Sequence, residues 1–384
     1  MEAYFDNSAT TKVLDSVKDI VVKTMTEDYG NPAAKHRRGM EAEQYIRNAK
    51  RILADTLKVQ EREILFTSGG SESNNMALIG TAWANKRAGK HIISTSIEHP
   101  SVYNPLGVLE ELGFEVTILP VDHDGHISLK ELEEAIRPDT ILVSTMYVNN
   151  EVGAVEPVEE ISKVIKTKNP STLYHVDAIQ AYGKYVIRPK KQGIDLLSVS
   201  GHKIHGPKGV GFLYIRSGVK IKPLIYGGGQ QAGLRSGTEN VPGVAGLGVA
   251  AKEMYTDHAA KIQKLTELKD YMTARLGEIE GTVVNSKKGA DSAPQIVSVS
   301  FEGVRSEVLL HALEDKNIYV SSGSACSSNH PGISGTLKGI GVSQKLLDST
   351  IRMSFSLFNT KEEIDYTIDV LKELVPVLRR YQRG

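Results

Sequence analysis

The chain has 384 residues, of which 40% are hydrophobic and 24% charged, a composition typical of a globular enzyme with a sizeable core. Lysine plus arginine and aspartate plus glutamate number 46 each, so the charge balance does not favour direct binding to nucleic acid or to a membrane surface. The single cysteine, Cys326, excludes an intrachain disulfide and any metal site built from several cysteines.

The N-terminus and the apolar runs carry no targeting or membrane-spanning signal. Residues 1–6 are acidic, and no basic stretch with an apolar run accompanies them, so they are not expected to be a signal peptide. The sequence contains no run of about 18 apolar residues, so a transmembrane helix is not expected. The expected location is therefore the cytoplasm.

Strands and helices are predicted to alternate from about residue 64 to residue 215. The first strand, residues 63–67, runs into a turn rich in glycine and serine, and a helix follows over residues 74–86. Backbone N–H groups at the start of this helix and the hydroxyl of Ser71 provide a site for an anion. An ordinary turn capped by a serine is the alternative. The glycines match neither a P-loop nor a dinucleotide-binding motif.

Polar residues follow the later strands of this region, predicted at residues 91–96, 115–119, 140–147 and 172–177. The alternation favours a mostly parallel sheet with helices on both faces. Ligands of such sheets bind beyond the carboxyl ends of the strands. The residues at these ends are therefore predicted to form one site: Gly70, His99, Asn150, Asp177 and Lys203.

Lys203 stands between two histidines in a turn rich in glycine and proline, residues 200–211, after the apolar strand 194–199. A solvated loop cation is the ordinary interpretation of such a lysine. The alternative is a nucleophilic amine that binds a carbonyl cofactor covalently, above all pyridoxal phosphate (PLP). That chemistry requires an acid facing the pyridinium nitrogen, and Asp177 at the end of a neighbouring strand meets the requirement.

Beyond residue 215 the pattern changes. A glycine-rich loop, residues 226–242, precedes a helical stretch predicted to run from residue 244 to residue 280 and to bridge two domains. The remainder is predicted to be a smaller α+β unit with strands at 295–301, 318–320 and 351–356 and helices at 306–315 and 361–380.

Cys326 lies in the most glycine- and serine-rich stretch of the chain, residues 321–335. A lone cysteine is ordinarily a small buried hydrophobic residue. Almost nothing apolar surrounds this one, however, so an exposed loop with a reactive thiol is favoured.

Arg352 interrupts an apolar strand pattern, residues 349–354. A buried guanidinium needs a planar anionic partner, and the α-carboxylate of a substrate fits through two parallel hydrogen bonds. A structural ion pair is the alternative.

Several motifs together resemble one family. Ser-Gly-His-Lys at residues 200–203 and Gly-Pro-Lys-Gly at 206–209, preceded by His-Val-Asp-Ala-Ile-Gln at 175–180, are similar to the class V aminotransferases, specifically to cysteine desulfurases of the NifS/IscS type. The similarity extends over nearly the whole chain, from residues 7–11 to residues 351–354.

The resemblance implies an α/β fold, the PLP-dependent transferase fold type I. A large PLP-binding domain, residues 14–260, is expected to contain a mostly parallel seven-stranded sheet. Residues 1–13 and 261–384 are expected to form a small α+β domain that carries the catalytic cysteine loop. The loop with Thr238 is expected to reach the phosphate of a partner's PLP, which implies a homodimer with shared active sites.

The resemblance also implies roles for individual residues. The expected catalytic residues are Cys326, Lys203 and His99, and Arg352 with Asn150 is expected to bind substrate. No metal is expected, because the pairs His202 with His205 and His123 with His126 lack further ligands. The expected PLP-binding residues are Gly70, Ser71, His99, Asn150, Asp177, Gln180, Ser200, His202, Lys203 and Thr238.

The implied activity converts L-cysteine to L-alanine and transfers the sulfur to the Cys326 thiol as a persulfide. A sulfur-acceptor protein, such as an iron–sulfur scaffold, is the expected partner. A selenocysteine lyase and a class V aminotransferase are the alternatives on the same fold. A non-catalytic scaffold is disfavoured because each expected site residue is present.

Overall fold

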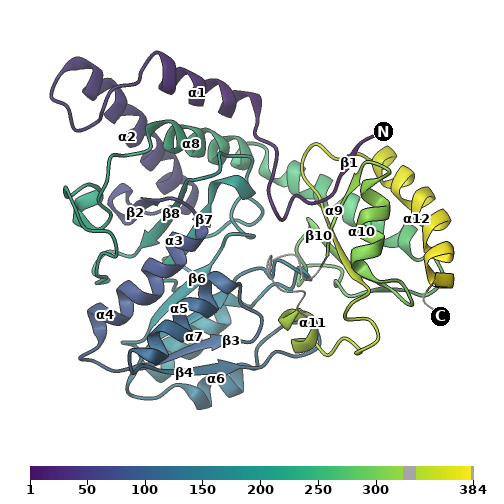
Figure 1. Ribbon diagram of the computed structural model, residues 1–384. Coiled ribbons are helices and arrows are strands. Elements are labelled where there is room, and N and C mark those ends of the chain that lie inside the picture. Colours follow the sequence, from purple (N-terminus) through teal and green to yellow (C-terminus); the bar gives the residue numbers. More distant parts are fainter. Residues whose placement is uncertain (323–333, 382–384) are drawn as a thin grey trace.

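A seven-stranded sheet forms the centre of the larger part of the molecule (Figure 1). The computed structural model describes residues 1–322 and 334–381. The strands of this sheet are β2 (Ile64–Thr67), β3 (His91–Thr95), β4 (Glu115–Leu119), β5 (Thr140–Met146), β6 (Leu173–Asp177), β7 (Leu196–Ser200) and β8 (Gly211–Ile215). Their spatial order is β2-β8-β7-β6-β5-β3-β4. The strand β8 runs opposite to the other six, which are parallel to one another. The prediction of a mostly parallel seven-stranded sheet is confirmed.

Helices cover both faces of this sheet. They are α1 (Asp15–Thr26), α2 (Arg37–Leu57), α3 (Gly70–Asn75), α4 (Thr81–Asn85), α5 (Pro100–Glu111), α6 (Leu129–Ala135), α7 (Val158–Lys168) and α8 (Val241–Tyr255). Neighbouring residues of a strand point to opposite faces. Val143 of β5 therefore packs in the core with α1, α2, α6, α7 and α8, whereas Leu142 packs in the core with α4, α5 and the residues just before α4. A π-helical segment, Met76–Gly80, joins α3 to α4.

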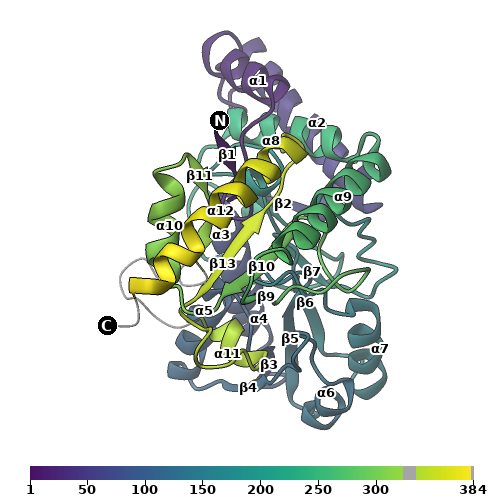
Figure 2. The same cartoon turned by 90° about the vertical axis from the view of Figure 1, so that its right-hand side faces the viewer.

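The C-terminal part of the chain, coloured green to yellow in Figure 2, forms a smaller unit. It has its own hydrophobic core. Its elements are α9 (His258–Leu276), β9 (Thr282–Val284), β10 (Ile296–Phe301), α10 (Ser306–Glu314), β11 (Ile318–Tyr319), β12 (Ser321–Ser322), α11 (Gly335–Gly339), β13 (Thr350–Ser354) and α12 (Lys361–Tyr381). The antiparallel sheet has the order β12-β13-β10-β9. The N-terminal strand β1 (Ala3–Tyr4) pairs with β11, so the start of the chain joins this unit. The boundary at residue 260 stays a prediction.

The single helix predicted over residues 244–280 is wrong, because the chain breaks between α8 and α9. Thr256 is extended (φ −73°, ψ 130°) and Asp257 has a left-handed backbone (φ 49°), which no α-helix accommodates. The ammonium of Lys261 donates to the carbonyl oxygens of Glu253 and Thr256, at 2.5 and 2.6 Å. A cation at the C-terminus of α8 stabilises that end of the helix.

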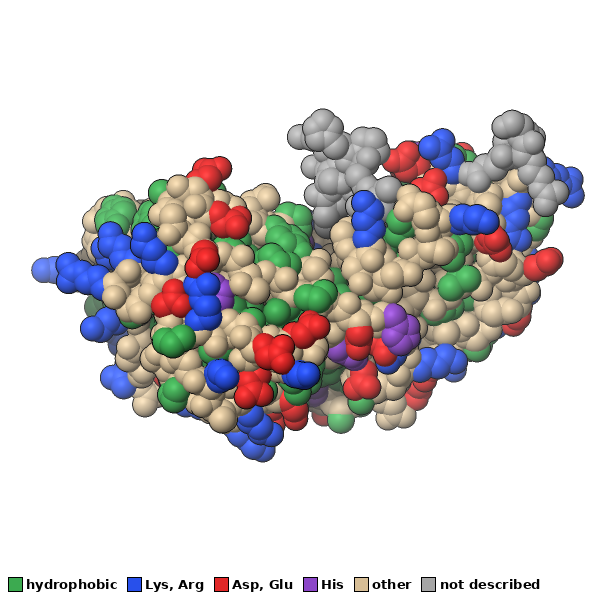
Figure 3. Space-filling model, turned by 90° about the horizontal axis from the view of Figure 1, so that it is seen from below, with side chains coloured by type: hydrophobic (Ala, Val, Ile, Leu, Met, Phe, Trp, Pro, Cys, Tyr) green, Lys and Arg blue, Asp and Glu red, His purple; other side chains and the backbone are tan. Residues whose placement is uncertain are grey.

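The surface mixes charges of both signs, in keeping with the zero net charge. Over most of the face drawn in Figure 3, acidic and basic side chains are interspersed among uncharged ones. Within residues 1–322 and 334–381, no helix has both the length and the apolar character needed to cross a bilayer.

Substitution of Gly211 tests how closely β8 approaches the turn after β2. A Cβ on Gly211 would lie 2.4 Å from the carbonyl oxygen of Val199 and 2.8 Å from Cα of Gly69. Both obstacles are backbone atoms, so Gly211→Ala is expected to lower the free energy of unfolding by about 1–3 kcal/mol, measured by urea denaturation.

The matched control is Gly107→Ala in α5, where a Cβ would meet no atom within 4 Å. This variant is expected to gain about 0.5–1 kcal/mol, because alanine loses less backbone entropy than glycine in a helix. If Gly211→Ala and Gly107→Ala had the same free energy of unfolding, the close approach of β8 to the turn at Gly69 would be contradicted.

Candidate active site

A cavity of about 480 Å³ lies beyond the carboxyl ends of the central strands of the large sheet. Its walls come from the turns after β2, β3, β5, β6 and β7, from the N-terminal segment and from the small sheet. The structure brings these predicted residues together on its walls: Gly70, Ser71, His99, Asn150, Asp177, Gln180, Ser200, His202, Lys203 and Arg352.

The turn between β2 and α3 presents free backbone donors to this cavity. Gly69 has φ 145°, a backbone conformation that residues with side chains rarely adopt. The N–H of Ser73 donates to the carbonyl oxygen of Gly69 at 3.1 Å, which begins the helical ladder. The N–H groups of residues 70–72 precede that bond and are available, with the hydroxyl of Ser71, to an anion.

Asp177 ends β6, and only 5% of its surface is exposed. Its Oδ1 accepts a hydrogen bond from the N–H of Ile179 at 3.0 Å, and its Oδ2 accepts one from the side-chain amide of Asn74 at 2.8 Å. Burial raises the pKa of this carboxyl, whereas the two donors and the nearby His99 and Lys203 oppose the rise. A cationic group facing Asp177 in the cavity would stabilise its ionised form.

Lys203 lies in a short turn, Gly201–Lys203, directly after β7. Its ammonium donates to the carbonyl oxygens of Ser8 and Ala9, at 2.5 and 2.7 Å. The side-chain amide of Gln180 donates to the same carbonyl of Ser8 at 3.0 Å. The backbone of the N-terminal segment thus holds the lysine amine at the cavity.

Arg352 in β13 brings the small sheet to the cavity. Its Nη1 donates to the carbonyl oxygen of Asn150 at 2.8 Å, and its Nη2 pairs with the carboxylate of Asp6 at 2.9 Å. The side chain is 7% exposed, and its Nε is buried without an acceptor among the described residues. The structural ion pair that the sequence left open is therefore present, and the guanidinium keeps N–H groups for a further anion.

The turn that carries Asn150 is shaped by its neighbour Asn149. The side-chain oxygen of Asn149 accepts hydrogen bonds from the N–H groups of Glu151 and Val152, both at 2.9 Å. Burial raises the pKa of Glu151, and the hydroxyl of Ser334 donates to its carboxylate at 2.5 Å. These hydrogen bonds fix the conformation of the turn at residues 149–152.

Two histidines on the cavity wall are shifted toward their neutral forms. Burial lowers the pKa of His202 to about 4, and the positive charge of Lys203 adds to this effect. Burial also lowers the pKa of His99, while Asp177 opposes this shift and Lys203 reinforces it. Both rings are therefore expected to be neutral at pH 7.

Two predicted site residues are not placed on the cavity wall. Thr238 is exposed on the loop between β8 and α8, and an ion pair of Arg235 with Glu72, at 2.9 Å, connects that loop to α3. Cys326 lies outside the described residues. Both assignments stay predictions.

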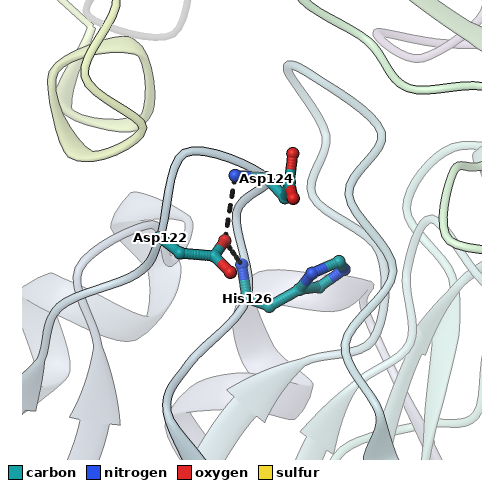
Figure 4. A group of neighbouring side chains, drawn as sticks. All are labelled: Asp122, Asp124 and His126. Atoms are coloured by element: carbon teal, nitrogen blue, oxygen red, sulfur yellow. Dashed lines mark hydrogen bonds between the residues drawn. The ribbon is translucent and has the colours of Figure 1, made fainter.

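One group of possible metal ligands lies apart from the residues that line the cavity. Asp122, Asp124 and His126 have ligand atoms within 4.8 Å of one another, the one such group among the described residues (Figure 4). The Asp122 carboxylate accepts hydrogen bonds from the N–H groups of Asp124 and His126, at 2.9 and 3.0 Å, and Asp124 pairs with Lys287. These contacts give the group a structural role in its turn.

The sequence did not identify the N-terminal segment as part of the cavity wall. Asp6, Ser8 and Ala9 line the cavity, whereas the sequence used residues 7–11 only as the start of the similarity to the family. The available signal was Arg352, since a buried guanidinium requires an acid close by. Asp6 is one of many acids in the chain, so this signal did not single it out.

Known proteins resemble this chain in sequence and in fold. The profile of the family described as Aminotransferase class-V matches residues 3–367. The chain belongs to this family. Cysteine desulfurase IscS of Dictyoglomus turgidum is 41% identical over 378 residues, covering 98% of this chain and 95% of the relative. IscS of Methanosarcina thermophila is 44% identical over 376 residues, covering 98% and 92%. A solved structure described as a NifS-like protein has a TM-score of 0.93 at 39% identity, covering 98% and 100%.

Membership of the class V aminotransferase family implies a cofactor that the cavity can be tested against. At this similarity over nearly its full length, the chain is a PLP-dependent cysteine desulfurase of the NifS/IscS type. The donor set fits PLP, because a buried carboxyl that needs a cation, a turn that needs an anion and a lysine amine share one cavity. Asp177, the turn at Ser71 and Lys203 supply these three features.

A buried acid beside this site gives a pH-dependent prediction. Burial raises the pKa of Glu98 from 4.5 to about 8, although Thr95 and the N–H of Met146 donate to its Oε1, at 2.6 and 2.9 Å. At this carboxyl the folded state therefore keeps a proton that the unfolded state loses between about pH 4.5 and 8, so the contribution of Glu98 to stability falls as pH rises through this window. Glu98→Gln is expected to remove at least about 1 kcal/mol of the fall between pH 5 and 8.

The measurement is urea denaturation at pH 5 and at pH 8. Glu111→Gln, at an exposed position of α5, is the control that is expected to keep the wild-type dependence. An unchanged pH dependence in Glu98→Gln would show that this carboxyl is not protonated in the folded state.

Proposed function

We propose that this desulfurase acts on L-cysteine, releases L-alanine and leaves the sulfur on Cys326 as a persulfide. The observation that carries the proposal is the meeting of Lys203, Asp177 and Arg352 on one cavity. A similar solved structure is described as SspA in complex with cysteine, with a TM-score of 0.82 at 37% identity, covering 93% of this chain and 100% of that one.

The chain's own residues divide the work of holding PLP. The turn at Gly70 and Ser71 would take the phosphate, and Lys203 would provide the covalent anchor. Ionised Asp177 would keep the ring nitrogen protonated, and His99 would hold the ring from the cavity wall. When bound, PLP supplies an electron sink for the negative charge at Cα of the amino acid. The remaining contacts are assigned to Asn150, Gln180, Ser200, His202 and, from a partner subunit, Thr238.

Arg352 is assigned to the α-carboxylate of L-cysteine. Its ion pair with Asp6 and its bond to Asn150 fix the plane of the guanidinium, which leaves N–H groups for a second acid. Asn150, held by the same contact, is the further substrate-binding residue. Lys203, whose amine lies on the cavity wall, moves the proton at Cα.

The sulfur step requires a thiolate, which Cys326 supplies. The thiolate attacks the sulfur of L-cysteine, so an S–S bond forms as the Cβ–S bond breaks. The bonding electron pair stays on carbon, which takes up a proton and leaves as alanine. The persulfide then passes to a thiol of an acceptor protein, such as an iron–sulfur scaffold.

The proposal includes a homodimer in the cytoplasm, where acceptor thiols stay reduced. Exposed apolar side chains on α1 and α2 (Val22, 53%; Met25, 62%; Met40, 65%) support an interface with a second copy. A selenocysteine lyase is the second candidate, because the same cavity would accept the heavier amino acid.

Substitution of the thiol separates desulfuration from transamination. Cys326→Ser is expected to bind PLP with an unchanged visible spectrum and to lose sulfide release from L-cysteine by about a hundredfold or more. The measurement pairs that spectrum with assays for sulfide and alanine. An aminotransferase would keep its activity, since transamination needs no thiol, and a wild-type protein that binds PLP but releases no sulfide would refute the desulfuration proposal.

Substitution of the guanidinium tests carboxylate binding. Arg352→Lys keeps the charge but loses the two-pronged geometry, so KM for L-cysteine is expected to rise roughly tenfold to a hundredfold. Arg275→Lys is the control, because Arg275 pairs with Asp365 and Glu278 of the small unit. If Arg352→Lys lowers the stability but leaves KM unchanged, Arg352 has only its structural role in the ion pair with Asp6, and the assignment to the substrate carboxylate is refuted.

A further inference from the structure

A side chain that the mechanism above does not use connects two residues of the active site. Asn74 of α3 is fully buried (0% exposed). One proton of its amide is donated to Oδ2 of Asp177 at 2.8 Å, and the other to the hydroxyl oxygen of Ser101 at 2.9 Å. Its own Oδ1 is buried without a partner among the described residues. A buried carbonyl oxygen without a donor costs about 1–3 kcal/mol. We infer that the two hydrogen bonds donated by the Asn74 amide offset this cost.

The proton order in this network follows from the chemistry of its members. An ionised carboxylate only accepts, so the Asn74 amide must turn its nitrogen toward Asp177. The hydroxyl oxygen of Ser101 then accepts from the same nitrogen, which leaves its own proton to donate. The ring nitrogen Nδ1 of His99 lies 2.8 Å from that oxygen. The backbone N–H of Ser101 also donates to Nδ1, at 3.1 Å.

Two donors directed at Nδ1 specify the tautomer of His99. Nδ1 must be the unprotonated nitrogen, so the neutral ring carries its proton on Nε2. Nε2 makes no hydrogen bond to any described residue and is the ring atom left for a ligand. Protonation at Nδ1 would require both Ser101 donors to be given up. The charged groups that face the ring are Asp177 and Lys203; Glu98 turns instead to Thr95 and the backbone of Met146.

We propose that Asn74 is a positioning residue that, through Ser101, fixes His99 as the Nε2–H tautomer, while its other donor favours the ionised form of Asp177. His99 then offers a hydrogen-bond donor to the cavity and is not a free base, so the proton at Cα falls to Lys203. This assignment rests on the proposed function for its catalytic meaning, but the tautomer itself is a property of the chain. The Asn74 amide thereby acts on two residues at the ends of different strands: it orients Ser101 toward His99 and donates directly to Asp177.

The test is long-range proton–nitrogen correlation NMR on histidine-labelled, PLP-loaded protein across a pH series. The His99 signals are identified among the 11 histidines by their loss in His99→Gln. Wild-type His99 is expected to show an unprotonated Nδ1 and a protonated Nε2. Ser101→Ala is expected to raise the pH at which the ring protonates by roughly 0.5–1 unit, because a donor to the neutral form is lost. Ser101→Thr keeps the hydroxyl and is expected to restore the wild-type titration.

Asn74→Ala is expected to shift the same titration upward and to weaken PLP binding, because the Ser101 hydroxyl loses its orientation and Asp177 loses a donor. The matched control is Asn75→Ala, since the amide of Asn75 donates to the carbonyl oxygen of Ser71 at 2.8 Å and not into this network. Should Asn74→Ala fail to fold, Ser101→Ala carries the test.

Two outcomes would overturn the proposal. One is a wild-type ring with its proton on Nδ1 or with mixed tautomers, and the other is a titration in Ser101→Ala that matches the wild type. The proposed function fails separately: a protein with the expected tautomer and shifts that releases no sulfide would still support the assignment to Asn74 and Ser101.

Discussion

The buried carboxyl of Asp177 is the constraint on which the site depends. A charge at 5% exposure is costly unless donors and a cation compensate it. The donors come from the next turn of the chain, Ile179, and from α3, Asn74. The cation must come from the cavity. Because α3 also begins at the turn with free backbone donors, one short helix sets the distance between this carboxyl and those donors.

The sequence predicted the parts of this arrangement that lie at strand ends. Each of these residues follows a compact apolar run, and parallel strands bring their carboxyl ends to one edge, so Asp177 and Lys203 could be placed together without a structure. The contact of Asp6 with Arg352 could not be predicted in this way, because 346 residues separate the partners. Only the packing of the small sheet against the N-terminal segment brings them together.

The roles of small polar residues could not be predicted from the sequence either. Asn74 and Ser101 carry no recognisable motif, and each is an ordinary residue for its place in a helix or beside a helix start. Their importance comes from hydrogen bonds between α3, α5 and β6, which depend on how these elements pack. The break at Asp257 escaped prediction for a similar reason, since apolar residues continue at helical spacing through it.

Ser8 of the N-terminal segment makes hydrogen bonds to both units of the molecule. The N–H of Ser8 donates to the hydroxyl of Ser354 in β13 at 2.7 Å, and its carbonyl oxygen accepts from Lys203 and Gln180. A shift of the small sheet would therefore pull on the acceptors of the lysine amine, and Arg352 would travel with the same strand. The carboxylate-binding guanidinium and the acceptors of the lysine amine are thus both attached to β13, one directly and one through Ser8.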